Sequence, residues 1–143
     1  MGLIFISQLE KNIKKYLEKI TLECGYIAPL ALKRQGGKKL EDLYEPLTLV
    51  SNSNSKEITI RYFDFSIFLE RNRILIEDDA GMGKSTLIKF LVSSYIKSNN
   101  FENSNYIPIF LELRNLNENG SILELINEKV LNNSTNNELL ELL

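Results

Sequence analysis

The residues best suited to chemistry lie together in one short run, DDAGMGKST, at positions 78–86. Glycines let backbone N–H groups turn inward around phosphate oxygens, because no side chain crowds the loop. A lysine directly after the second glycine adds a positive charge at the phosphates, and the serine that follows it offers a hydroxyl to Mg²⁺. The sequence therefore predicts a nucleotide phosphate-binding loop. Its residues are Asp78, Asp79, Ala80, Gly81, Met82, Gly83, Lys84, Ser85 and Thr86.

The run departs at one position from the phosphate-loop pattern G-x-x-x-x-G-K-[ST], because Asp78 stands where the first glycine is expected. If that position requires positive φ, aspartate is among the few other residues that tolerate it, at a cost of about 1 kcal/mol. Asp78 and Asp79 also bring two carboxylates near the phosphates, and solvent screening leaves a modest penalty. We expect a site that is weakened but not abolished.

Two elements have to hold the loop in place. The run RILIE (73–77) is short and almost continuously apolar, as is typical of a strand buried in a parallel sheet. Residues 84–96 carry apolar side chains on nearly all sides, which indicates a buried helix. The alternative to a nucleotide site is an ordinary capped turn with a surface lysine. The order of strand, glycine-rich loop and helix favours the nucleotide site.

Further elements are predicted on both sides of the loop, and together they indicate an α/β fold. The run YIPIFLEL (106–113) predicts a second buried strand, and EITIRYF (57–63) alternates like a half-buried one. A short helix is expected over residues 64–72. Three helices are expected to begin where Ser or Thr precedes Glu by three residues. These capping boxes are Ser7 with Glu10, Ser121 with Glu124, and Thr135 with Glu138.

The first of these helices is amphipathic, with lysines on one face, and it is expected to end at Cys24 and Gly25. Packing on the protein itself or on a partner helix is the usual role of such a face, although membrane surfaces also bind basic amphipathic helices. The run RQGGKK (34–39) reads as a connection. We therefore divide the chain into an N-terminal helix and linker, residues 1–39, and a nucleotide-binding domain, residues 40–143.

Composition narrows the classes of function. The 143 residues contain no histidine, which removes His-based metal sites and Ser-His-Asp catalysis, and the single cysteine fits a reducing cytoplasm. Neither a signal peptide nor a run long enough to span a bilayer is visible, so no membrane partner is expected. Residues 1–40 are basic, but the remainder is acidic, which makes nucleic acid an unlikely ligand.

Three stretches together resemble the NACHT family of signal-transducing (STAND) P-loop ATPases. They are LEDLYEPLTL (40–49), RILIEDDAGMGKSTLIKFL (73–91) and YIPIFLELRNL (106–116). The resemblance implies a P-loop NTPase αβα sandwich with a parallel sheet, and ATP or ADP bound with Mg²⁺. It also implies a role in anti-phage defence or innate-immune-like signalling, with self-association or a NACHT-type partner. A possible adenine pocket would be formed by Tyr44, Glu45, Pro46 and Leu47, although a core-packing role for this stretch is equally open.

The family pattern is incomplete in this chain. No apolar run ending in Asp, the Walker B strand, follows residue 116, and Glu112 is a poor substitute because the resemblance places it on the preceding strand. Efficient ATP hydrolysis by this chain alone is therefore not expected. The leucines at 139–143 end a predicted helix with nothing left in the sequence to pack against, so the chain looks truncated and its sheet incomplete. We expect such a chain to associate through residues 121–143. Two alternatives are a short regulator that assembles with full-length NACHT proteins and a small-molecule P-loop kinase.

Overall fold

The computed structural model describes residues 2–27, 37–52, 54–62, 64, 73–98, 106–116 and 120–131. The chain divides into two compact units, the first formed by Met1–Ile20 with Ile109–Leu143 and the second by Thr21–Pro108. The boundary expected between residues 39 and 40 lies inside the second unit. The helix expected over residues 64–72 and the one expected from Thr135 lie outside the described residues. No helix in the described part of the chain combines the length and apolar character needed to cross a membrane.

The first unit packs the N-terminal helix against a C-terminal one. Helix α1 (Gly2–Gly25) buries Asn12, Tyr16 and Ile20, which recur every four residues and so lie along one face. The Asn12 side-chain amide donates to the carbonyl of Leu131, 3.2 Å away, at the end of helix α6 (Ile122–Leu131). The Tyr16 hydroxyl accepts the backbone N–H of Phe110 at 2.9 Å. These bonds satisfy polar groups that burial would otherwise leave unpaired.

The two helix starts of this unit differ in how well the sequence predicts them. Ser121 and Glu124 form the expected capping box: the Glu124 carboxylate accepts the Ser121 N–H at 2.8 Å, and the Ser121 hydroxyl accepts the Glu124 N–H at 3.1 Å. The expected cap at Ser7 is wrong, because α1 already begins at Gly2. Neither glycine nor proline interrupts residues 3–24, so nothing in the backbone stops the helix from extending past Ser7.

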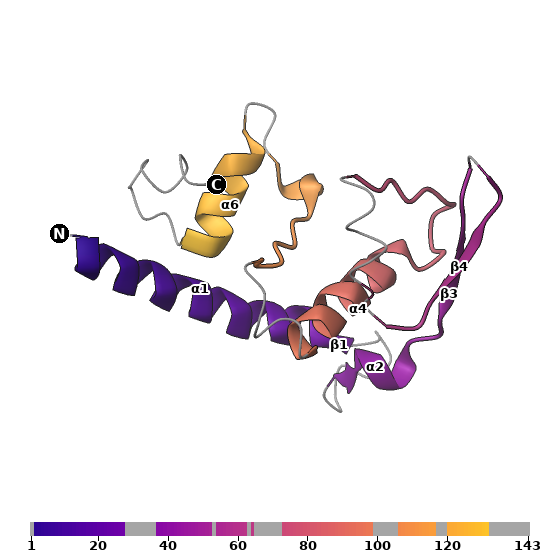
Figure 1. Ribbon diagram of the computed structural model, residues 1–143, viewed down its shortest axis with the longest axis horizontal. Helices are drawn as coiled ribbons and strands as arrows, with labels where there is room; N and C mark the ends of the chain where they lie inside the picture. Colours follow the sequence, from indigo (N-terminus) through magenta and orange to yellow (C-terminus); the bar gives the residue numbers. More distant parts are fainter. Residues whose placement is uncertain are drawn as a thin grey trace. The chain divides into compact units, whose positions relative to one another are not determined.

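The second unit contains two small antiparallel sheets and helix α4 (Lys84–Lys97), as Figure 1 shows. Strand β1 (Tyr26–Ile27) pairs with β2 (Lys38–Lys39), which leads directly into helix α2 (Leu40–Leu43). Strand β3 (Leu47–Val50) pairs with β4 (Glu57–Ile60) in a hairpin, in which Leu47 lies opposite Ile60 and Leu49 lies opposite Ile58. Strand β4 confirms the expected strand over its first four residues.

The core of the second unit gathers around α4. Leucine and aromatic side chains of this helix are buried with Leu40 of α2 and Ile60 of β4. The helix expected over residues 84–96 is confirmed, and five of its side chains are buried, whereas Ile88 is 38% exposed. The partly buried residues around this core are Ile27, Tyr44, Leu47, Leu49, Ile58 and Ile76.

The strands expected on both sides of α4 are not part of a ladder among the described residues. Residues 73–79 and 106–112 have no regular secondary structure there, and Leu113, the last residue of the expected second strand, begins a 3₁₀ turn (η2, Leu113–Asn115). A strand is defined by its hydrogen-bonded neighbours, which a pattern of apolar residues does not supply. Ile76 packs on the core, whereas Leu75 is 81% exposed. The parallel sheet remains a prediction.

Candidate phosphate-binding loop

The second glycine of the loop sets the start of α4. Gly83 is the residue before the helix and has left-handed backbone angles, φ 86° and ψ 6°, which favour glycine strongly. Its carbonyl accepts the first bond of the helix, from the N–H of Leu87 at 2.8 Å. The N–H groups of residues 84–86 precede that bond and so have no acceptor within the helix. They form the positive end of the helix dipole, where anions bind favourably.

The lysine of the loop folds back over it. The Lys84 ammonium donates to the carbonyl oxygens of Asp78 and Asp79, each 2.6 Å away. An ammonium group has three donors, so one remains beyond these two bonds. The positive charge is thus held against the loop and is not extended into solvent, although the sequence alone allows either arrangement.

Asp78 occupies the position of the missing glycine without backbone strain. Ser55, in the β3–β4 hairpin, is the one non-glycine residue with positive φ in the described part of the chain. The expected cost of a left-handed conformation at Asp78 is therefore absent, because this turn does not use positive φ at its first residue. The Asp78 carboxylate is exposed and accepts the N–H of Asp79 at 2.8 Å. Its charge is the remaining penalty for an anionic ligand.

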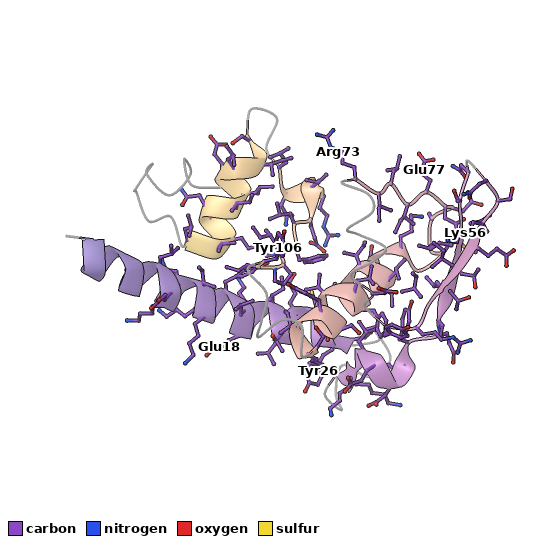
Figure 2. The ribbon with its side chains drawn as sticks, in the orientation of Figure 1. Glu18, Tyr26, Lys56, Arg73, Glu77 and Tyr106 are labelled. Atoms are coloured by element: carbon purple, nitrogen blue, oxygen red, sulfur yellow. The ribbon has the colours of Figure 1, made fainter. Side chains whose placement is uncertain are left out.

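The middle of the loop is open. Gly81 has φ 87°, and no described atom outside this glycine and its chain neighbours lies within 4 Å of the position that a Cβ would take. Glycine is needed there for the backbone conformation alone. Met82 is 56% exposed beside it, and its N–H lies 3.5 Å from the carbonyl of Asp79. In the segment that leads into the loop, Arg73 and Glu77 are exposed as well (Figure 2).

The two hydroxyl residues of the loop lie on the first turn of α4. Ser85 is exposed and Thr86 is half-buried. Groups of three or more His, Cys, Asp or Glu that could bind a metal ion are absent from the described residues. The Mg²⁺ contact expected at Ser85 stays a prediction.

The stretch considered for the adenine pocket is partly a packing element. The Tyr44 ring stacks on Phe90 of α4, with ring centroids 3.7 Å apart and planes 8° apart. Its hydroxyl donates to the carbonyl of Ile60 at 3.1 Å and accepts the N–H of Leu47 at 3.4 Å. Burial raises the pKa of the Tyr44 phenol above its ordinary value, and the bond from Leu47 acts in the opposite direction.

The structure brings one residue of this stretch to the loop. The Cδ1 atom of Leu47 lies 3.4 Å from the position that a Cβ of Gly83 would take. Glu45 and Pro46 are exposed between Leu47 and Tyr44. The sequence did not predict this contact. In the sequence, only the alternation LTLV (47–50) points to the side on which Leu47 lies, because residues 47 and 49 of a strand face the same way.

Glu112, the carboxylate considered as a Walker B substitute, has a partner nearby in sequence. It accepts two hydrogen bonds from the Arg114 guanidinium, at 3.1 and 2.7 Å. Both residues belong to the first unit, whereas the loop belongs to the second.

Neither a protein-family model, nor a curated protein, nor a solved structure matches this chain.

Proposed function

We propose that residues 78–86 bind the phosphates of ATP or ADP together with Mg²⁺. The main support for this proposal is the geometry of Gly83 and Lys84. Left-handed Gly83 starts α4 and leaves the N–H groups of residues 84–86 without helical acceptors, while the Lys84 ammonium is held against the loop. Backbone donors, a helix dipole and a cation in one place make an anion site.

Each group has a distinct task in this proposal. The loop N–H groups bind phosphate oxygens, and Lys84 exchanges its two carbonyl acceptors for phosphate. That exchange is favourable because an ionised acceptor bonds a cation more strongly than a neutral carbonyl does. The Ser85 hydroxyl would hold Mg²⁺, whose charge would offset the carboxylates of Asp78 and Asp79. Mg²⁺ should therefore matter more here than in a loop without acidic residues.

In its wider setting we propose a nucleotide-binding part of a NACHT-type signalling ATPase. It would act in the cytoplasm, in anti-phage defence or innate-immune-like signalling, and associate with copies of itself or with related proteins. The proposal is supported by the three stretches of family-like sequence. It is also consistent with the position of Leu47, in the first of these stretches, beside Gly83 of the phosphate loop.

Calorimetric titration with Mg-ATP and Mg-ADP tests the binding site. Lys84→Ala should remove most of the affinity, because it deletes the cation of the loop. Lys38→Ala is the matched control, since Lys38 is an exposed lysine of β2 whose loss changes the net charge equally. It should bind like the original protein. Equal binding by the original protein and Lys84→Ala would show that the loop does not bind phosphate.

A further inference from the structure

One apolar side chain connects the β3–β4 hairpin to the phosphate loop. Leu47 places its Cδ1 atom 3.4 Å from the point where a Cβ of Gly83 would lie, so it is a near neighbour of this glycine. No other described atom outside the chain neighbours of Gly83 comes within 4 Å of that point. Leu47 therefore lies beside Gly83, on the side where any other residue would carry its Cβ.

The position of Leu47 is itself fixed from two directions. Strand pairing places it opposite Ile60, which is buried in the core. Its N–H donates to the Tyr44 hydroxyl at 3.4 Å, and that hydroxyl donates to the carbonyl of Ile60. The Tyr44 ring stacks on Phe90, two turns along α4 from the loop. Leu47 is thus tied through Tyr44 to the helix that begins directly after Gly83.

We propose that Leu47 is a positioning residue for the phosphate loop, and this inference rests on the proposed function. By packing on Gly83 it holds that residue in its left-handed conformation. That conformation orients the N–H groups of Lys84, Ser85 and Thr86 toward the ligand. In this role Leu47 acts through the loop backbone beside it.

Glycine needs such a contact more than any other residue does. It adopts left-handed and right-handed conformations about equally well, so its own backbone does not select one. Without Leu47, Gly83 would have to be ordered by the ligand, and the entropy of that ordering would reduce affinity. Preorganised donors are effective because that ordering is complete before binding.

The hairpin offers a closely matched control. Leu47 and Leu49 alternate on β3, both are half-buried, and both pack on the same core cluster. Only Leu47 lies near Gly83. Leu47→Ala and Leu49→Ala should reduce stability to urea by similar amounts, since both delete the same atoms from the same cluster.

Nucleotide affinity should separate the two variants. Leu47→Ala is expected to weaken Mg-ADP binding by about tenfold, the lower end of the loss seen when positioning groups are removed from metal sites. Leu49→Ala should bind within about twofold of the original protein, because a factor of two is only ~0.4 kcal/mol. Leu47→Met, which nearly conserves volume, should restore affinity. In the free protein, the Gly83 amide resonance should shift in Leu47→Ala and stay in place in Leu49→Ala.

Failure of this inference can be told apart from failure of the proposed function. If Lys84→Ala abolishes binding but both leucine variants lose affinity equally, the loop binds phosphate and Leu47 has no special role. If the Gly83 resonance does not respond to Leu47→Ala, the contact does not control that residue. Should Lys84→Ala bind normally, the function itself would be wrong.

Discussion

Gly83 and Lys84 define the site at the scale of single residues. Gly83 supplies a conformation that an L side chain rarely adopts, and Lys84 supplies the charge, already held against the loop. Both residues could be predicted from the sequence, because the order glycine-lysine-serine is the most specific part of the phosphate-loop pattern. The carbonyls that bind the lysine could not, since they depend on how the backbone of residues 78–82 turns.

Asp78 gives a prediction that concerns charge alone, because its backbone is unstrained. Asp78→Asn keeps an oxygen that can accept the Asp79 N–H and removes the negative charge near the phosphates. Mg-ATP should bind roughly twofold more tightly, from about 0.5 kcal/mol, the range of exposed charge interactions. The gain should shrink as salt is added, which calorimetry at two ionic strengths would show.

Asp42→Asn, an equal change of charge at an exposed position of α2, is the control and should have little effect. Unchanged or weaker binding by Asp78→Asn would mean that the ligand does not sense this carboxylate. The acidic start of the loop would then have no bearing on affinity.

At the scale of elements, an ion pair joins α2 to the end of α4. The Lys97 ammonium lies 2.7 Å from the Glu41 carboxylate, and its hydrogen bond and charge hold the pKa of Glu41 below the ordinary value of 4.5. Lys39, at 3.8 Å, lowers this pKa less. A carboxylate with a lowered folded-state pKa stabilises the fold above the unfolded-state pKa, and the effect is lost as pH falls through the folded value.

Titration of the carboxyl resonance by NMR would check this pair. Lys97→Met should return the pKa of Glu41 toward its ordinary value, and Lys39→Met should change it less. A larger change in Lys39→Met would show that the pair is formed differently in solution.

The capping box of α6 is a second testable element. Ser121→Ala should lower the free energy of unfolding by about 1 kcal/mol, because the N–H of Glu124 loses its acceptor at the helix start. Glu124→Gln keeps a side chain that can accept the Ser121 N–H, so it should be milder than Glu124→Ala. Urea unfolding measures all three. Equal stability of Ser121→Ala and the original protein would rule out a contribution from this cap.

These elements show where sequence patterns suffice. Caps and helix periodicity are local, so α4 and α6 could be predicted closely from residues a few positions apart. The β3–β4 register and the packing of Tyr44 on Phe90 join residues far apart in sequence, which composition and spacing do not specify. The apolar runs at 73–77 and 106–113 predict strands, but whether they pair depends on neighbours that a run does not name.

At the scale of the whole molecule, Glu112 is the one carboxylate that was weighed as a Walker B substitute. Glu112 belongs to the first unit and is bonded to Arg114, and the loop belongs to the second. No Walker B sequence follows residue 116. We therefore predict that the chain releases phosphate from ATP no faster than its Lys84→Ala variant. Turnover that depends on Lys84 would contradict this, and Glu112→Gln would then test whether that carboxylate takes part.

The central claim is that the backbone at the start of α4 binds nucleotide phosphates, and amide NMR during a Mg-ADP titration tests it most directly. The account predicts that the largest shift changes fall on Gly81, Gly83, Lys84, Ser85 and Thr86, and that they disappear in Lys84→Ala. Amides of the same unit far from the loop in sequence, such as those of β1, should move little. Shifts centred elsewhere, or equal shifts with and without Lys84, would contradict the assignment of this loop.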